Sequence, residues 1–449
     1  MLFSFRENFN LPMQQTLSTT EVFTPSTPAY YAYVEREYLN QQLVDALRTP
    51  GKQIIVFGQT GSGKTTLLHN KLNQTYEGKI RCSCTQQTTF DQILLDAFDQ
   101  LETFYISETS NSKSRKLSTK LERDFMFIKA EVGAEIGNST ETKVSRTLPP
   151  QLTPSRLARF IGEIKHCWVI EDVHKINQEE KIKISQVMKV FMDEAVNYPE
   201  LKIILAGAVG TAKEIITLEK DMRNRTIEIF VPLMSEHELK AIISKGENKL
   251  NLSLEYSLTE AISKFSCGLP SVTHQLCLNI CLNKQIYETC EFHTELSLSD
   301  FISALKKYVS EISDSLKEHF DRAIRYNEAS KFLLEVLRSI LLANKYSVTK
   351  KEIQNKLNLS SVHFSIEQLT HSLNYLSSTS SEEVLNYDPL TQEYSFLNPF
   401  FKVYCYCHIE LEKAEKNEQL LFNFQKENDK NREMIRLILK DGGYSDIEF

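Results

Sequence analysis

The chain has 449 residues, of which 41% are hydrophobic and 25% are charged. This composition is typical of soluble globular domains and excludes a disordered, collagen-like or rod-forming chain. Its 14 glycines and 12 prolines leave few residues for tight turns, which favours long helices over a sandwich or barrel. The formal net charge of −7 excludes a chain-wide positive field, so any binding of nucleic acid or anionic membrane must be local.

The sequence predicts a cytoplasmic protein with no membrane partner. Arg6, Glu7 and Asn8 stand where a signal peptide would have its apolar region, and the most apolar stretch, 201–210, is too short to cross a bilayer. The nine cysteines are an odd number without the CxxC spacing of zinc sites, which indicates reduced thiols and no metal bound by cysteine.

In chain order, residues 1–29 are predicted to be a polar N-terminal arm and residues 30–232 an α/β domain. Apolar runs at strand length alternate there with helical patterns, which predicts a three-layer fold around a parallel sheet. Residues 102–150, rich in Ser, Thr, Lys and Glu, are predicted to be an insertion. The expected strands are residues 54–57, 79–84, 168–170, 202–206 and 226–231, and the expected helices include 154–164 and 181–195.

Strand patterns stop after Pro232. Residues 233–327 show only helical periodicity, at 236–245, 258–265, 271–283 and 298–316, and are predicted to be an all-α lid domain. Residues 328–409 are predicted to be a winged-helix domain, with helices at 331–342, 349–357 and 365–376 and strands at 384–387 and 393–397. Residues 410–449 are predicted to be a charged helical tail.

Residues 58–65 match the P-loop pattern GxxxxGK[ST] between an expected strand and an expected helix. Glycines let backbone N–H groups surround phosphates, the lysine would neutralise the β- and γ-phosphate oxygens, and the hydroxyl of Thr65 would hold Mg²⁺. We therefore expect ATP and Mg²⁺ as ligands. The expected phosphate-binding residues are Gly58, Gln59, Thr60, Gly61, Ser62, Gly63, Lys64, Thr65 and Thr66.

Glu171 and Asp172 follow the expected strand 168–170 and so reach the edge of the sheet at which ligands bind. One carboxylate would bind Mg²⁺ together with Thr65, and the other would orient the attacking water. The sequence leaves open which carboxylate has which role.

These two motifs resemble those of the AAA+/STAND branch of P-loop ATPases, which includes origin-recognition and immune-signalling ATPases. Residues 33–37 are similar to the segment that precedes the family's P-loop, which implies that Arg36 lies beside the adenine. Residues 222–229 are similar to the segment before the family's last core strand. That resemblance implies that Arg225, or else Arg223, is an arginine finger for a neighbouring subunit. Residues 267–270 are similar to the STAND GxP motif, which implies that Pro270 packs on the base.

The sequence departs from the family in two respects. The family usually has Asp before Glu at the acidic pair, and the strand ending at 205–207 carries no polar side chain at the usual sensor position. Slow hydrolysis and a nucleotide-held oligomeric switch are therefore expected. The chain most resembles bacterial stand-alone ATPases found beside defence and mobile-element genes, which implies a role in anti-phage defence with a separate effector or sensor protein.

Two alternatives stay open. A DNA-binding ATPase of initiator or transposition-adaptor type would use the winged helix, but residues 365–376 contain no Lys or Arg, which favours packing against a protein. A nucleotide-binding scaffold without turnover is the other alternative. His166, His174 and His274 are interpreted as hydrogen-bonded neighbours of the site. In a DNA-binding protein, Gln368, His371 and Asn374 would contact base edges. The insertion also carries a local basic cluster, which consists of Lys113, Arg115, Lys116, Lys120 and Arg123.

Overall fold

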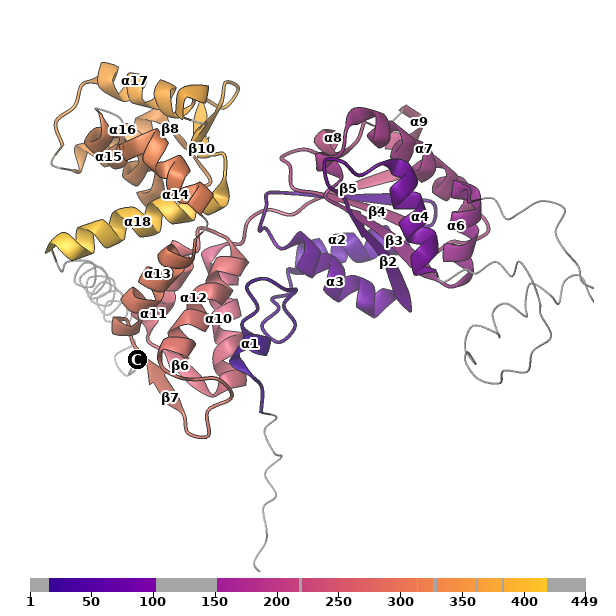
Figure 1. The fold of residues 1–449 in the computed structure, drawn as a ribbon, viewed down its shortest axis with the longest axis horizontal. Helices are drawn as coiled ribbons and strands as arrows, with labels where there is room; N and C mark the ends of the chain where they lie inside the picture. Colours follow the sequence, from indigo (N-terminus) through magenta and orange to yellow (C-terminus); the bar gives the residue numbers. More distant parts are fainter. Residues whose placement is uncertain are drawn as a thin grey trace, which may run out of the picture.

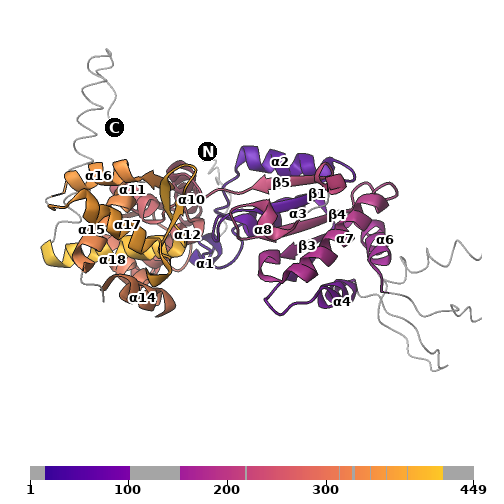
Figure 2. The same cartoon turned by 90° about the horizontal axis from the view of Figure 1, so that it is seen from above.

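The computed structural model describes residues 16–101, 152–217, 220–312, 314–325, 329–343, 345–360, 362–381 and 383–417. An α/β part lies at one end of the molecule, and a mainly helical part lies at the other (Figures 1 and 2). The predicted insertion 102–150, with its basic cluster, and the predicted tail beyond 417 fall outside the described residues. Among the helices that are described, none is both long enough and apolar enough to cross a membrane.

A five-stranded parallel sheet forms the centre of the α/β part, in the order β2-β3-β4-β1-β5. The strands lie where the sequence predicts them, with small shifts at their ends. Residues Ile55, Leu205 and Glu228 stand side by side across the three strands β4, β1 and β5. The bounds are β1 (Gln53–Phe57), β2 (Gly78–Ser83), β3 (His166–Glu171), β4 (Lys202–Gly207) and β5 (Thr226–Phe230).

Helices cover both faces of the sheet. Because successive strand residues point to opposite faces, Ile54 packs with α2 (Glu37–Arg48) and α3 (Lys64–Thr75), while Ile55 belongs to the core on the other face. That second core contains α4 (Phe90–Gln100), α6 (Pro154–Glu163) and α7 (Gln178–Glu194). The predicted three-layer α/β fold is confirmed.

The lid contains α10 (Glu236–Leu250), α11 (Tyr256–Phe265), α12 (Pro270–Asn283) and α13 (Ser299–Glu311). It is not all-α as expected, because β6 (Leu252–Leu254) and β7 (Thr294–Leu296) form a small parallel sheet. Strands of three residues are too short to show a period in the sequence. The expected single helix over 298–316 is also interrupted, and α14 (Asp314–Phe320) begins after α13.

The C-terminal domain combines three helices with a three-stranded antiparallel sheet in the order β8-β10-β9. The sequence analysis missed β8 (Ser347–Thr349) and the first part of the long α18, which follows the sheet of this domain. Phe265 of the lid stacks on Tyr406 of α18, with 4.4 Å between ring centroids, so lid and C-terminal domain share one core. The other bounds are α15 (Ser330–Leu342), α16 (Lys350–Asn358), α17 (Ile366–Leu376), β9 (Leu385–Asp388), β10 (Glu393–Phe396) and α18 (Pro399–Asn417).

The N-terminal arm packs with the lid. Its short helix α1 (Thr19–Val22) starts with a capping box between Ser18 and Glu21. The Thr19 hydroxyl donates to the Ile286 carbonyl at 3.0 Å, and Phe23 is buried in the core that contains α10 and α12. The arm then runs back to α2, so it connects the two parts of the molecule (Figure 1).

Candidate nucleotide site

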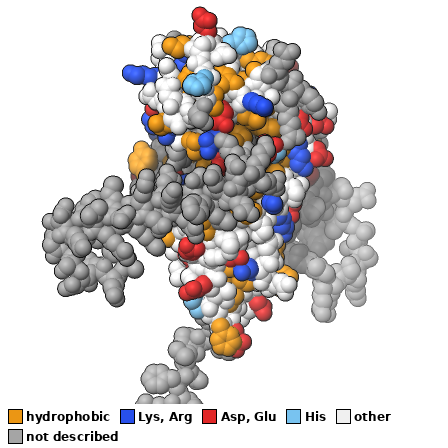
Figure 3. Space-filling model, turned by 90° about the vertical axis from the view of Figure 1, so that its left-hand side faces the viewer, with side chains coloured by type: hydrophobic (Ala, Val, Ile, Leu, Met, Phe, Trp, Pro, Cys, Tyr) orange, Lys and Arg blue, Asp and Glu red, His pale blue; other side chains and the backbone are white. Residues whose placement is uncertain are grey.

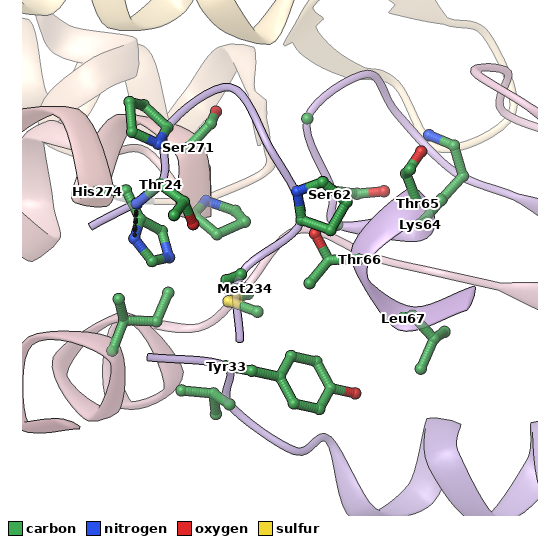
Figure 4. A pocket seen from close by; sticks show the side chains of 18 of the residues that line it. Thr24, Tyr33, Ser62, Lys64, Thr65, Thr66, Leu67, Met234, Ser271 and His274 are labelled. Atoms are coloured by element: carbon green, nitrogen blue, oxygen red, sulfur yellow. Dashed lines mark hydrogen bonds between the residues drawn. The ribbon is translucent and has the colours of Figure 1, made fainter. Parts of the chain in front are cut away.

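A cavity of about 370 Å³ lies where the P-loop, the N-terminal arm and the lid meet (Figure 4). The arm contributes residues 24–29, the segment between the arm and α2 contributes residues 32–34, and the P-loop with α3 contributes residues 61–67. Pro270, Ser271 and His274 of α12 form the wall on the lid side, and Phe400 of α18 also reaches the cavity. The N-terminal arm, the P-loop, the lid and α18 therefore build one site.

At two positions of the P-loop a side chain would meet both an unfavourable φ and a close neighbour. Gly58 has a φ of +150°, and a Cβ there would lie 2.2 Å from the Val231 carbonyl oxygen. Gly61 has a φ of +79°, and its Cβ would lie 2.7 Å from the side chain of Leu269. The chain then enters α3 at Lys64. The loop thus opens on a helix N-terminus, where free backbone N–H groups attract phosphate.

Lys64 points back onto its own loop. Its Nζ donates to the carbonyl oxygens of Gly58 and Gln59, each at 2.8 Å. Burial lowers the pKa of Lys64 to about 8, and the nearby carboxylates of Asp172 and Glu171 act in the opposite direction. The Ser62 hydroxyl is buried and has no hydrogen-bond partner among the described residues. Both side chains thus have unused capacity for an anionic ligand in this loop.

The acidic pair lies at the carboxyl end of β3, with each carboxylate already paired to a base. Glu171 accepts a hydrogen bond from Arg81 of β2 at 2.8 Å, and Asp172 accepts one from Lys175 at 2.6 Å. Asp172 adopts the left-handed conformation, with a φ of 59°. The described residues contain no group of three His, Cys, Asp or Glu side chains able to hold a metal. One or two carboxylates with Thr65 and phosphate oxygens are the ligands that suit Mg²⁺.

His174 follows β3, and its ring lies beside the end of β4, the strand that offers no polar side chain there. Its Nδ1 accepts a hydrogen bond from the Ala208 backbone N–H at 3.2 Å. Burial lowers its pKa, and the Asp172 charge acts in the opposite direction. The histidine is thus a hydrogen-bonded neighbour of the acidic pair.

Arg36 lies at the wall of the cavity, but its guanidinium hydrogen-bonds to the segment that connects the core to the lid. It donates to Glu238 of α10 at 2.7 Å and to the Pro232 carbonyl at 2.8 Å. Arg36 therefore stabilises the connection between β5 and α10, which the sequence pattern did not suggest. Pro270, the first residue of α12, lines the cavity directly.

Arg225 lies far from its own P-loop. It precedes β5, and its carbonyl accepts from the Gln53 N–H at the start of β1, whereas the P-loop follows the end of β1. Its guanidinium pairs with Asp193 at 2.9 Å. Arg223 ends the short helix α9 (Lys220–Arg223) and is exposed. Neither arginine contributes to the site of its own chain.

Sequence analysis missed the contacts that the C-terminal domain makes with the P-loop. Gln59 Nε2 donates to the Tyr346 hydroxyl at 2.5 Å. Phe400 lies so close that a Cβ on Gly61 would be 3.0 Å from its ring. No local pattern marks either aromatic residue, because the chain folding alone brings them to the loop.

A P-loop after β1 of a parallel sheet, leading into α3, defines this part of the chain as a P-loop NTPase fold. No protein-family model and no curated protein matches the sequence. Among solved structures, the chain is similar to the Walker-type ATPase PABY2304 of Pyrococcus abyssi, with 13% identity, a TM-score of 0.45 and coverage of 83% of this chain and 96% of that one. It is also similar to Cdc6p of Pyrobaculum aerophilum, with 15% identity, a TM-score of 0.41 and coverage of 88% of this chain and 98% of that one. For RuvB of Thermotoga maritima the identity is 13%, the TM-score is 0.38, and the coverage is 82% of this chain and 94% of that one.

Proposed function

We propose that the chain binds ATP and Mg²⁺, hydrolyses ATP slowly, and acts as a nucleotide-held switch of the AAA+/STAND type. The observation that carries this proposal is the contact of the C-terminal domain with the P-loop, through Tyr346 on Gln59 and Phe400 beside Gly61. A nucleotide that favours one arrangement of this contact shifts the domain between two positions.

The residues of the site divide the chemical work. Lys64 would exchange the carbonyls of Gly58 and Gln59 for phosphate oxygens. Mg²⁺, held by Thr65 and one carboxylate of the acidic pair, would supply electrostatic stabilisation of the phosphates. The other carboxylate would orient water. Arg81 already pairs with Glu171, so Glu171 is not free to bind Mg²⁺ or to orient water in this arrangement. This pairing supports slow turnover.

We further propose that the C-terminal domain predicted over residues 328–409 is a winged helix that binds a protein. Its element order supports this, and α17 exposes Glu367, Gln368, His371 and Asn374 but no Lys or Arg. On the face drawn in Figure 3, basic and acidic side chains of the described residues are interspersed with hydrophobic ones. Such a surface suits a protein partner better than a phosphate backbone. The role in anti-phage defence stays a prediction from the resemblance.

Assembly is the readout that tests the switch. We propose that Arg225 completes the site of a second copy, since it cannot reach its own P-loop. Light scattering after size exclusion should show a mass increase with ATP or a non-hydrolysable analogue but not with ADP. Lys64→Ala and Arg225→Ala should abolish it. Arg159→Ala removes an arginine paired with Glu194 in a similarly exposed position and should leave the increase intact.

The outcomes separate the candidate functions. A mass that never changes with nucleotide, although ATP binds, contradicts the switch and favours the scaffold. A change that needs duplex DNA and weakens with salt favours the DNA-binding ATPase.

A further inference from the structure

On the lid side of the cavity lies a histidine whose tautomer is set by a hydrogen bond from the arm. His274 of α12 is 3% exposed, and its Nδ1 accepts a hydrogen bond from the Thr24 N–H at 3.1 Å. Burial lowers its pKa to about 4, so the ring is neutral at physiological pH. A neutral ring that accepts at Nδ1 carries its hydrogen on Nε2.

That Nε2–H is a donor beside an open cavity. The ring of Phe23 lies edge-on to the imidazole, with 6.1 Å between centroids. Figure 4 shows the His274 ring beside the cavity, with its second nitrogen on the side away from the Thr24 hydrogen bond. The imidazole is thus oriented by the arm, not by solvent.

Two buried hydroxyls in the same wall have no partner. The Oγ1 of Thr24 and the Oγ of Ser271 make no hydrogen bond with any described residue, although both residues line the cavity. Buried polar groups are nearly always satisfied, so such exceptions indicate a ligand. They lie on the opposite side of the cavity from Lys64 (Figure 4).

The chemistry of this wall suits a neutral ligand group. The residues that line the cavity include no Asp or Glu, and Pro25, Val34, Ile242 and Pro270 supply apolar surface. Phosphates belong at Lys64, where a cation and a helix N-terminus are present. The remaining part of a nucleotide, a flat apolar base with a polar edge, fits a wall of this composition.

We propose that His274 donates a hydrogen bond from Nε2 to a ring nitrogen of the nucleobase, with the hydroxyls of Thr24 and Ser271 completing the polar edge. The inference rests on the proposed ATP binding. Since the arm orients this donor, the bound base links the N-terminal arm to α12. His274 thus selects the base through Nε2 and fixes the position of the arm through Nδ1.

Single-atom analogues of ATP test the hydrogen bond. Binding of ATP and of 1-deaza-, 3-deaza- and 7-deaza-ATP is measured by calorimetry on the full chain. One analogue, the one that lacks the accepting nitrogen, should bind the wild type roughly 3- to 10-fold more weakly than ATP. All three analogues binding like ATP would overturn the inference.

Two variants locate the donor. His274→Asn keeps an acceptor for the Thr24 N–H but loses the donor at Nε2, so the sensitive analogue and ATP should bind it equally. His274→Gln places an amide N–H near Nε2 and should restore part of the difference. A difference that persists in full in His274→Asn would assign the donor to another group and overturn the proposal.

A further variant and a folding check separate loss of binding from loss of fold. Thr24→Val keeps the shape of its side chain and removes the hydroxyl, and should weaken ATP binding two- to fivefold. Thermal unfolding checks that each variant folds. If wild type and Lys64→Ala both fail to bind ATP, the proposed function itself fails. If ATP binds in a Lys64-dependent way but no analogue differs, only the inference about His274 fails.

Discussion

Lys64 is half-buried and Lys202 is fully buried, and loss of solvent is the main cause that lowers the pKa of each lysine to about 8. They differ in their surroundings. Lys64 faces the nucleotide cavity, whereas Lys202 donates to the carbonyl oxygens of Thr49 and Lys52 at the other end of the sheet. The same titration therefore has different consequences at the two positions.

ATP affinity should fall as the pH rises above about 8. Phosphate raises the pKa of Lys64 in the complex, so binding takes up a proton wherever the free site is deprotonated. The dissociation constant then increases by up to roughly tenfold per pH unit. Calorimetry between pH 7 and 9.5 measures this.

The matched control is Lys202. Lys64→Met should bind weakly without this dependence on pH, while Lys202→Met should retain it. Lys202 also affects the pH dependence of stability. Its pKa is about 8 in the folded state and 10.5 in the unfolded chain, so the unfolded chain binds more protons between these values and the free energy of unfolding increases as the pH rises from about 8 towards 10.5. An equal loss of pH dependence in both variants would contradict the role of Lys64.

Arg81 should limit access of Mg²⁺ to Glu171. The guanidinium holds that carboxylate at 2.8 Å and competes with any cation for it. Arg81→Gln is expected to lower the Mg²⁺ concentration for half-maximal ATP turnover by roughly two- to fivefold, the range of a partly exposed ion pair. Arg159→Gln removes a comparable ion pair away from the site and serves as the control. An unchanged Mg²⁺ requirement in Arg81→Gln would show that Glu171 is not a Mg²⁺ ligand for which Arg81 competes.

At the scale of elements, the arm depends on one glycine in α10. Alanine normally favours a helix over glycine, but a Cβ on Gly246 would lie 2.2 Å from the Phe23 ring. Gly246→Ala should therefore lower the free energy of unfolding by about 1–3 kcal/mol and weaken ATP binding, since the arm lines the cavity. Urea unfolding and calorimetry measure the two effects.

A compensating variant at Phe23 and a control at another glycine make this prediction specific. Phe23→Leu should relieve part of the cost of Gly246→Ala. Gly210→Ala, where the nearest contact of a new Cβ is 3.6 Å away, should change neither property. A Gly246→Ala variant as stable as wild type would show that the arm is not held in this way.

The elements also show what the sequence could predict. Strands, core helices and the P-loop follow from local hydrophobic periods and a spaced motif, and the parallel sheet follows from their alternation. The arm's place on the lid, the Arg36 contact with Glu238 and the aromatic contacts on the P-loop depend on residues distant in the chain. A single sequence gives no local signal for such pairs, so the parts of the cavity wall that the arm and Phe400 supply could not be predicted.

At the scale of the whole molecule, the contact of the C-terminal domain with the P-loop should hold the chain in a compact form. The double variant Tyr346→Phe and Phe400→Ala removes the hydroxyl contact and the ring beside Gly61. It is expected to increase the radius of gyration without nucleotide and to reduce the change on adding ATP. Small-angle X-ray scattering measures both.

An exposed tyrosine of the lid provides the control. Tyr287→Phe changes a hydroxyl on a side chain that is 64% exposed and should leave the scattering unchanged. If the double variant keeps the radius of the wild type in both states, the contact is not what positions the domain.

The place of the arm also bears on how the chain folds during synthesis. Leu17, Val22 and Phe23 belong to the same core as residues of α12 and α18, which a ribosome makes hundreds of residues later. The parallel sheet can close as soon as β5 has emerged, whereas residues 17–23, which are made before the sheet, must wait for the lid. These residues are therefore among the last to reach their native place, and their apolar side chains stay exposed to chaperones in the meantime.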